Sequence, residues 1–517
     1  MGQLTYRANL SAPTIPFTVA SSGRHTIYKQ YDQNHVPPMI SDKDLDKDIG
    51  VPQAIYAHNI LPTGDGYQAV DFNLEVYKLA GDRTFVQVVS VRDVDGNVAY
   101  IGLTTEKKLY YYRPPFFTWN YLYEFASDHL PTLTAAQVSG VSYIFASNWN
   151  CYTYNFTNNT LEEAILNGVE MLDIIGITSV QGYLIAYSTD SVAWGSLLDP
   201  TDMEPSLATG AGGGTVEQIR GKIISCVYNI TGFIIYTTAN AVVAVYSGNE
   251  TFPFNFREIN NSGGILNTTY VANEANSGTH YAFTTSGLQQ ITAVETKSVF
   301  PELTDFLTSK IFEDFDPVTR ELTHTELTTP LAKRIAFIAD RYLVLSYGAS
   351  SLTHMIVYDS FLERFGKLKV PHVSVFEWAG HATVDADVTK TSFGILRSDG
   401  SVLTVNFTPA AGTWAELPAA SRPVLLLGRY QFVRSNFIQL DRVEVETTYQ
   451  SDDYDCYALP SLDGKNFSTP VLGIENVTSD YVRNFFFKAA ALNFSVLLAG
   501  KFNLSTLILH LSVHGER

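Results

Sequence analysis

The chain has 517 residues, of which 45% are hydrophobic, 13% aromatic and 17% charged, so it can bury large cores and is not disordered. Thirty-four basic residues against fifty-two acidic ones give a formal net charge of −18. This charge argues against a protein that reads nucleic-acid sequence or binds an anionic membrane, because both need a cationic surface. A protein that lets a DNA duplex slide past without adhering is compatible with this charge.

Cys151, Cys226 and Cys456 are odd in number and far apart, so no disulfide framework or cysteine zinc site is predicted. Folding in a reducing cytoplasm is the simpler expectation. The first thirty residues lack the charged and apolar regions of a secretory signal. No uninterrupted apolar stretch approaches the roughly 18 residues that a membrane-spanning helix needs, so no membrane span is expected.

Residues 1–75 are rich in proline and polar residues and are predicted to form an N-terminal arm and a lead-in strand. Their charged run contains four alternating aspartates: Asp42, Asp44, Asp46 and Asp48. Alternate carboxylates suit a calcium loop, but Lys47 stands where the turn glycine belongs, and Gln53 replaces the closing glutamate. We therefore interpret the run as a solvated charged segment and predict no metal site.

Residues 76–418 consist of short β-branched and aromatic segments separated by polar turns, which is a strand pattern. The Asp95-Gly96 pair between two apolar runs is typical of a tight hairpin turn. Seven such units begin near Asp82, Ser142, Gly182, Gly232, His280, Arg341 and Ser392. Their spacing of roughly 40 to 60 residues is typical of four-stranded propeller blades, which seal one another because none can cover both its faces.

We therefore predict an all-β fold whose body is a β-propeller of about six to eight blades. The alternative is that these hairpins belong to a sandwich or to several small β domains. Loop or helix insertions are predicted near 161–175, 198–222 and 301–330. The first and third have apolar residues at intervals of three and four, which indicates short amphipathic helices.

The second insertion contains a glycine run beginning at Gly212 and is predicted to be a long loop. Counted from Gly210 and Gly212, it does not match a dinucleotide-binding fingerprint, because Thr215 stands where the third glycine belongs and no parallel strand-to-helix unit surrounds it. A phosphate-binding loop is therefore not expected here.

Residues 419–517 have a pattern of their own and predict an additional C-terminal β-sandwich domain of about a hundred residues. In the segment DRVEVET, apolar positions such as Val443 alternate with acidic positions such as Glu444, as in a half-solvated strand. The pair Asp463-Gly464 indicates another tight hairpin.

No catalytic, cofactor-binding or metal-binding residue is predicted. The eleven histidines include no His-Glu-x-x-His motif, and the pair His372 and His381 lacks the spacing of a helical metal site. No Gly-x-Ser-x-Gly motif is present, and a Ser/His/Asp triad built from distant residues stays open. Paired carboxylates of a glycosidase are the remaining enzymatic option, but the acidic cluster of Glu313, Asp314 and Asp316 is interpreted as a solvated face.

The most unusual local segment is aromatic. Its members are Tyr110, Tyr111, Tyr112, Pro114, Pro115, Phe116, Phe117 and Trp119. Exposed, such a cluster would mark a partner interface. Buried, it would form the closing wall of a blade. Both interpretations stay open from the sequence.

Several passages resemble, in the same order, the tail hub or nozzle proteins of short-tailed bacteriophages, a family also described as packed-DNA stabilisation proteins. They are PQAIYAHNILPTGDGYQAVDFN from Pro52, GYLIAYSTDSVAWGS from Gly182, RYLVLSYGASSLTHMIVYDSFLERFGKL from Arg341, DRVEVET from Asp441 and LPSLDGKNFST from Leu459. The passages span most of the chain, and none is a catalytic motif.

The resemblance implies a structural virion protein of the tail that folds in the host cytoplasm. It implies a homohexameric ring below the portal and adaptor proteins, with a central conduit that retains packed double-stranded DNA and passes it at ejection. It also implies that tail fibres or spikes dock on the outer surface, and that there is no enzyme activity and no cofactor. Acidic side chains lining the conduit would repel a duplex that carries one charge per roughly 1.7 Å.

Three other functions are alternatives. A receptor-binding tail fibre or spike protein usually shows coiled-coil heptads or long β-helical repeats, and neither is present. A β-propeller glycoside hydrolase would hold two carboxylates about 5 to 9.5 Å apart in its central funnel. A propeller scaffold with no connection to a virus is the third.

Overall fold

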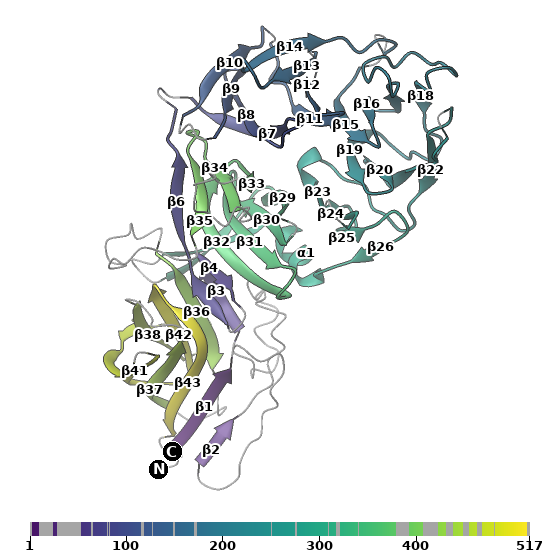
Figure 1. Cartoon of the computed structure of the whole chain (residues 1–517). Helices are drawn as coiled ribbons and strands as arrows, with labels where there is room; N and C mark the ends of the chain where they lie inside the picture. Colours follow the sequence, from purple (N-terminus) through teal and green to yellow (C-terminus); the bar gives the residue numbers. More distant parts are fainter. Residues whose placement is uncertain are drawn as a thin grey trace.

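The computed structural model shows a propeller of β-sheets with a second β domain beside it (Figure 1). It describes residues 3–9, 24–27, 53–63, 66–79, 81, 83–114, 118–126, 128–147, 150–169, 173–249, 251–274, 277–308, 310–316, 321–339, 341–378, 392–406, 422–430, 438–447, 454–462, 468–479 and 481–513.

The first three blades follow one another directly along the chain, each an antiparallel sheet of four strands. Blade one contains β7 (Phe85–Arg92), β8 (Val98–Thr104), β9 (Lys108–Tyr112) and β10 (Asn120–Glu124). Blade two contains β11 (Leu133–Val138), β12 (Val141–Ala146), β13 (Cys151–Asn155) and β14 (Thr160–Ala164). Blade three contains β15 (Gly176–Val180), β16 (Tyr183–Tyr187), β17 (Ser191–Trp194) and β18 (Gly212–Thr215).

Blades four and five repeat this order and are followed by an insertion. Blade four contains β19 (Ile223–Asn229), β20 (Gly232–Thr237), β21 (Ala241–Tyr246) and β22 (Phe254–Glu258). A short 3-10 helix, η2 (Thr268–Tyr270), leads into blade five, which contains β23 (Val271–Glu274), β24 (Thr279–Thr284), β25 (Gly287–Ile291) and β26 (Thr296–Ser298). The insertion consists of the helix α1 (Pro301–Thr308) and a hairpin of β27 (Ile311–Asp316) and β28 (Glu321–Glu326).

Blades six and seven complete the ring. Blade six contains β29 (Ala332–Ile338), β30 (Tyr342–Gly348), β31 (Leu352–Asp359) and β32 (Arg364–His372). Blade seven contains β33 (Ser374–Trp378), β34 (Ser392–Leu396) and β35 (Val402–Asn406), and its fourth strand is β6 (Asp71–Val76) from the N-terminal part of the chain. The seven blades confirm the predicted all-β propeller. The first strands of successive blades contact one another from β7 through β33 and back to β7, so they form the innermost ring.

Burial between blades explains why the sequence reads as repeated apolar hairpins. Seven buried clusters each combine residues from two neighbouring blades. In β20, Phe233 and Ile235 pack toward blade three, whereas Ile234 and Tyr236 pack toward blade five. Because successive side chains of a strand point to opposite faces, a strand covered on both faces is continuously apolar.

The predicted insertions are corrected in two places. The segment from Leu161, where a helix was expected, begins in β14, which pairs with β13 as the outer strand of blade two. The glycine run expected to be a loop is β18, which pairs with β17. A Cβ atom on Gly213 would lie 2.6 Å from the carbonyl oxygen of Val192, so only glycine lets the two strands approach this closely. The helix expected near Glu302 is present as α1.

The β domain is built from the two ends of the chain. One of its sheets contains β3 (Gln53–His58), β36 (Val424–Tyr430), β42 (Asn493–Gly500), β38 (Tyr454–Ser461) and β39 (Val471–Leu472). The other contains β37 (Ile438–Thr447), β41 (Val482–Ala491), β40 (Ile474–Ser479), β43 (Asn503–Val513), β1 (Gln3–Asn9) and β2 (Arg24–Ile27). Both sheets contribute to one buried core. As expected for β37, Val443 and Val445 are fully buried.

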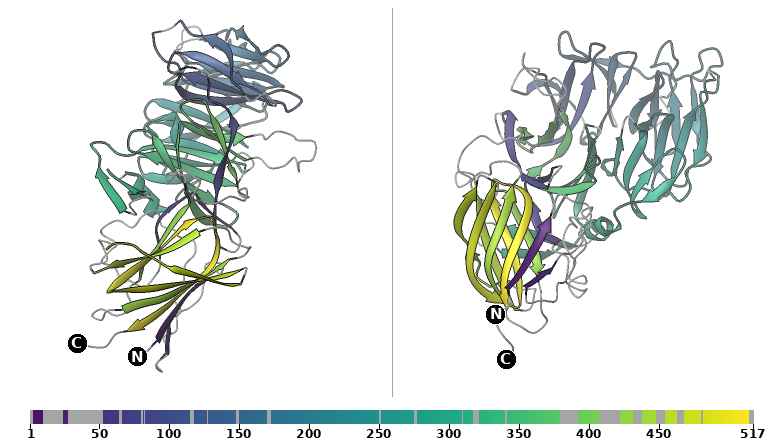
Figure 2. Two further views of the ribbon diagram at one scale, coloured as in Figure 1. Left: turned by 90° about the vertical axis from the view of Figure 1, so that its left-hand side faces the viewer. Right: turned by 60° about the horizontal axis from the view of Figure 1, so that its bottom comes forward.

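The two domains share strands (Figures 1 and 2). Blade six continues through β4 (Ile60–Pro62) and β5 (Tyr67–Ala69) into β43, so one twelve-stranded sheet runs from the propeller into the β domain. The predicted segment 1–75 is therefore more than an arm and a lead-in strand, because part of it completes blade seven and part of it lies in the core of the β domain. Asp42 to Asp48 lie outside the described residues.

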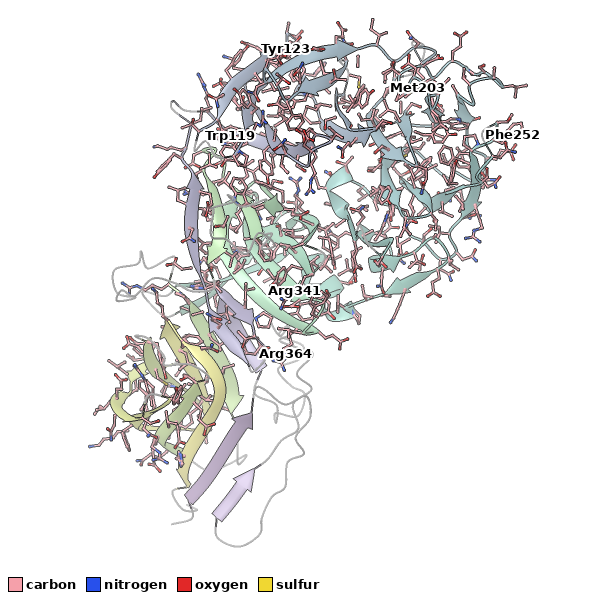
Figure 3. All side chains as sticks on the ribbon, in the orientation of Figure 1. Trp119, Tyr123, Met203, Phe252, Arg341 and Arg364 are labelled. Carbon is pink, nitrogen blue, oxygen red and sulfur yellow. The ribbon has the colours of Figure 1, made fainter. Side chains whose placement is uncertain are left out.

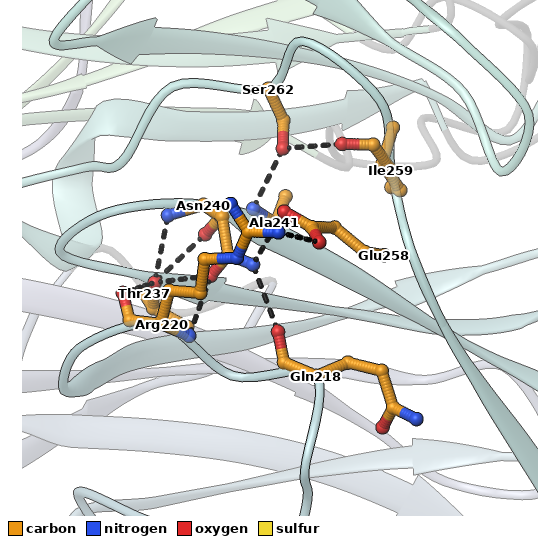
Figure 4. A network of polar contacts seen from close by, with 8 residues as sticks. All are labelled: Gln218, Arg220, Thr237, Asn240, Ala241, Glu258, Ile259 and Ser262. Atoms are coloured by element: carbon orange, nitrogen blue, oxygen red, sulfur yellow. Dashed lines mark hydrogen bonds and ion pairs between the residues drawn. The ribbon is translucent and has the colours of Figure 1, made fainter.

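Polar contacts hold the turns of the blades together, as blade four illustrates (Figure 4). The side chain of Asn240 accepts a hydrogen bond from the backbone amide of Arg220 and donates one to the carbonyl of Gln218, at 3.1 and 2.9 Å. It also donates to the Glu258 carboxylate, 3.2 Å away, which pairs with the Arg220 guanidinium at 2.7 Å. One buried amide thus joins the turn after β20 to the segment that enters β19.

Candidate functional site

Three parts of the chain meet in a polar cluster where the propeller joins the β domain. We call it the junction cluster and define it as Tyr56, Asp314, His354 and Lys369. Tyr56 lies on β3 of the β domain, Asp314 on β27 of the inserted hairpin, and the other two lie on β31 and β32 of blade six. The cluster therefore joins the domains at a place where only one residue pair, Lys367 with Ile60, links β32 to β4.

Three donors converge on one oxygen atom of the cluster. The Tyr56 hydroxyl donates to Asp314 Oδ1 at 2.8 Å, and Lys369 Nζ donates to the same oxygen at 2.6 Å. His354 Nε2 lies 3.4 Å from it. The lysine supplies a positive charge beside the carboxylate, so the ionised form of Asp314 is favoured.

The electrostatics of Asp314 follow from these contacts. Burial alone would raise the pKa of Asp314, but the hydrogen bonds and charges of His354 and Lys369 outweigh it and hold that pKa well below its usual range. Burial lowers the pKa of His354, and its contact with Asp314 offsets only part of that effect. The cluster therefore holds an ionised aspartate beside a histidine that burial keeps neutral.

His354 is also held through its ring by the same hairpin. Phe312 approaches it edge to face with ring centroids 5.3 Å apart, and Tyr347 stacks on it at 5.3 Å. Phe312 and Asp314 are two positions apart on β27, so their side chains point to the same face of that strand. The hairpin therefore clamps the imidazole with an aromatic ring and a carboxylate.

The neighbouring backbone contacts leave little room between the domains. Asn59 has φ of 56° and accepts a hydrogen bond from the backbone amide of Lys369 at 3.0 Å. A Cβ atom on Gly366 would lie 2.6 Å from the carbonyl oxygen of Ile60. Arg364, which lies at the junction (Figure 3), donates to the carbonyl of Thr63 at 3.0 Å.

His58 lies beside this cluster and is fully buried. Its Nε2 atom donates to the carbonyl of Arg422, which leads into the C-terminal part of the β domain. Its Nδ1 atom has no hydrogen-bond partner among the described residues. Burial, followed by the charge of Lys369, lowers the pKa of His58 to about 3, so the ring is neutral.

The chemistry of the junction cluster suits a structural role, which is to link chain segments. Asp314 Oδ1 already accepts hydrogen bonds from Tyr56 and Lys369, and the low pKa of the Asp314 carboxyl group makes it a weak base. The arrangement holds three separate chain segments together through one ionised group, the Asp314 carboxylate.

The sequence did not identify this cluster. Asp314 was interpreted as part of a solvated acidic face, and the structure corrects this, because its side chain is 33% exposed and paired with Lys369. The side chains of Glu313 and Asp316 lie outside the described residues. No local signal could have identified the site, because its four members come from positions 56, 314, 354 and 369.

The aromatic segment lies at the seam between blades one and seven. Tyr110, Tyr112 and Trp119 are buried there, with 2%, 0% and 4% of their surfaces exposed. The interpretation as a blade wall therefore holds for these residues, while Pro115, Phe116 and Phe117 lie outside the described residues. Tyr112 stacks on Trp378 of blade seven with ring centroids 5.2 Å apart.

The other residues considered in the sequence do not gather in one place. His372 is buried in blade six, and His381 lies outside the described residues. Within the described ranges, no three His, Cys, Asp or Glu side chains are arranged to hold a metal ion. The helices of the described part of the chain are too short or too polar to cross a membrane.

Comparisons with known proteins give distant structural similarities. No protein-family model and no curated protein matches the chain. Among solved structures, it is similar to the WD40 β-propeller domain of Doa1, with 8% identity, a TM-score of 0.39, and coverage of 65% of this chain and 97% of that one. It is also similar to YCF48 bound to a D1 peptide, with 10% identity, a TM-score of 0.41, and coverage of 68% and 99%.

A third similar structure is YCF48 from Cyanidioschyzon merolae, with 9% identity, a TM-score of 0.37, and coverage of 65% and 98%. Similarities this distant carry no argument about function. The chain is a β-propeller protein on the strength of its own seven blades and closed inner ring, with a β domain that shares a sheet with blade six.

Proposed function

We propose that the chain is a structural protein of a virion, the tail hub or nozzle subunit of a short-tailed bacteriophage. In this role six copies form a ring below the portal and adaptor proteins, retain the packed genome, pass it at ejection and anchor tail fibres or spikes. The proposal starts from the ordered passages that resemble this family. They fall on β3 to β6, on blades three, six and seven, and in the β domain.

The observation that carries the proposal is the way the two domains are joined. A ring subunit that holds pressurised DNA must transmit load between its parts without hinging. Here a twelve-stranded sheet crosses from blade six into the β domain, and the junction cluster ties the inserted hairpin to both. A continuous sheet and a partly buried ion pair favour one rigid body.

Charge supports the same role. With −18 per chain, six copies would carry an excess of carboxylates that repels the phosphates of a duplex. Repulsion keeps DNA from adhering while it passes, because affinity for DNA comes largely from cations that neutralise phosphates. A protein of this charge serves as a conduit more readily than as a DNA-binding module.

The test is assembly. The purified full chain, alone and mixed with a portal and adaptor complex of a short-tailed phage, should be measured by light scattering and imaged by electron microscopy. The proposal expects a small species alone and a six-fold ring on the complex. A stable trimer would favour a receptor-binding fibre, and hydrolysis of a polysaccharide would favour a glycosidase. Either result, or no binding to the complex, would overturn the proposal.

A further inference from the structure

One arginine of the innermost ring reaches the next blade without meeting a counter-charge. Arg334 lies on β29, and its Nη1 atom donates to the carbonyl of Val373, which precedes β33, at 3.2 Å. β29 and β33 are neighbouring strands beside the centre of the propeller (Figure 1). Within the described ranges, Arg334 forms no ion pair, and its Nε and Nη2 atoms form no hydrogen bond. A single neutral contact therefore holds the guanidinium.

The groups around this guanidinium carry no negative charge. Ser346 lies opposite Arg334 on β30, and its hydroxyl group donates to His372 Nε2 at 2.8 Å. His372 Nδ1 donates to the carbonyl of Val370 at 2.7 Å. Burial lowers the pKa of His372, and the charge of Arg334 lowers it further, so the ring is neutral. This ionisable neighbour therefore gives Arg334 no counter-charge.

The surroundings of Arg334 are dense but not closed. Burial lowers the pKa of Arg334 to about 10, which is the direction expected for a cation that is removed from water with no anion beside it. The side chain is nevertheless partly open to solvent. Both observations fit a side chain in a narrow opening that a small ion can enter. A charge left unpaired there is destabilising, and an anion that pairs with it removes that cost.

The charge of blade six favours an anion at this place. Residues 332–372 carry a net charge of +3, whereas 41 residues at the average of this chain would carry about −1.4. The charged residues are Lys333, Arg334, Arg341, Arg364, Lys367 and Lys369 against Asp340, Asp359 and Glu363. Arg341 pairs with Asp359 at 2.6 Å, and Lys369 has its own partner in the junction cluster. The surplus positive charge attracts an anion to this blade.

We infer that Arg334 anchors an anion-binding site at the seam between blades six and seven, and that this site takes a small oxyanion, either phosphate or a carboxylate. The oxyanion accepts two parallel hydrogen bonds from Nε and Nη2, while Nη1 keeps its bond to Val373. The planar guanidinium suits such a ligand because its donors form a fixed fork. The site is separate from the junction cluster, and the inference does not depend on the proposed function.

The experiment follows urea unfolding of the full chain at pH 7 in chloride, phosphate and acetate buffers of equal ionic strength, which keeps general screening constant. Added phosphate is expected to raise the urea midpoint of the wild type until the site is saturated. Arg334→Met should raise the phosphate concentration that gives half of this effect at least about tenfold. In chloride this variant should be as stable as the wild type or more stable, and in saturating phosphate it should be less stable.

Arg257→Met is the matched control. Arg257 also donates one hydrogen bond to a carbonyl of the next blade, that of Ala293 at 2.7 Å, but its side chain is exposed. Its loss should leave the effect of phosphate unchanged. Arg334→Lys keeps the charge without the planar fork, and it serves if Arg334→Met does not fold. This variant should need more phosphate than the wild type for the same effect. Circular dichroism checks that each variant is folded.

The two oxyanions identify the ligand. A larger effect of phosphate assigns the site to a phosphate group, and a larger effect of acetate assigns it to a carboxylate. The inference is overturned if neither oxyanion stabilises the wild type beyond chloride, if both Arg334 variants respond as the wild type does, or if Arg257→Met also removes the response. An equal loss of stability by Arg334→Met in all three buffers would overturn it too, because the guanidinium would then only brace the two blades.

Discussion

Trp119 Nε1 donates a hydrogen bond of 2.6 Å to the carbonyl oxygen of Gly400, which ties blade one to blade seven. The same seam is crossed by the Tyr100 hydroxyl, which donates to the carbonyl of Glu377 at 3.1 Å, and by an ion pair of 3.7 Å between Arg92 and Glu377. The seam is where the ring closes, between residues that are far apart in the chain. Its contacts therefore have to offset a large loop-closure entropy.

Replacing Trp119 by phenylalanine should weaken this seam. Trp119→Phe removes the donor and leaves the buried carbonyl of Gly400 without it, so we expect a loss of roughly 1 to 3 kcal/mol in the free energy of unfolding. Urea unfolding followed by fluorescence measures this loss of free energy. Tyr121→Phe on the adjacent strand β10 is the control, because Tyr121 is 57% exposed, and it should change stability little. Equal effects of the two substitutions would contradict a closing role for Trp119.

The junction cluster predicts a strong coupling between Asp314 and Lys369. Asp314→Asn and Lys369→Met each leave one partner without its counter-charge, whereas the double variant removes both charges. A double-mutant cycle on urea unfolding should therefore give a coupling energy of roughly 1 to 3 kcal/mol. The longer and more exposed pair of Lys108 and Glu124, 3.7 Å apart with 27% and 54% of the two side chains exposed, should give less than about 1 kcal/mol in the same measurement. Additive effects at the junction would argue against a charged joint.

The hydrogen bonds of Asn240 in the turn of blade four predict that this side chain contributes more to the free energy of unfolding than an exposed asparagine does. Asn240→Ala removes the acceptor for Arg220 and the donor to Gln218 in a buried turn, so we expect a loss of roughly 2 kcal/mol. Calorimetry measures the melting temperatures of this variant and of a matched one. Asn158→Ala is matched to it, because Asn158 is exposed and accepts one bond from Thr160, and it should cost only a few tenths of that. Similar melting temperatures would refute the network.

The buried histidines predict a loss of stability in mild acid. His280 Nε2 lies 2.9 Å from the carbonyl of Tyr228 and must donate to it, so Nδ1 accepts from the Tyr236 hydroxyl at 2.8 Å. The neutral ring satisfies both contacts. Burial lowers the pKa of His280 to about 4, and burial likewise lowers the pKa of His372 to about 4.

Because the unfolded chain binds protons at a higher pH than the folded chain does, the stabilisation is complete above about pH 6.5 and is lost as the pH falls toward 4. For His280 alone, the loss at pH 4 is on the order of 3 kcal/mol. His280→Gln should flatten the dependence of the urea midpoint on pH within this window. His129→Gln, at an exposed histidine, should not change it. A slope that His280→Gln leaves intact would assign the acid sensitivity to other groups.

The local pattern of the sequence determined the hairpins. The Asp95-Gly96 turn lies between β7 and β8, where Gly96 has φ of 81°. The alternation in β37 correctly predicted which valines are buried. These features depend on residues within one hairpin, where side-chain period and turn chemistry act together. The same pattern predicted the propeller, because strands buried on both faces need neighbours on both sides.

The tertiary structure alone decided which distant strands pair. β6 completes blade seven beside β35, and Asp314 reaches Tyr56 and Lys369. The sequence placed the start of the chain in an arm and Asp314 on a solvated face, because a single strand or carboxylate carries no record of its distant partner. The physical reason is that the partner of an outer strand depends on which sheet edge lies beside it after the propeller has formed. In the same way, a charged side chain removed from water is stable only where folding brings a counter-charge to it.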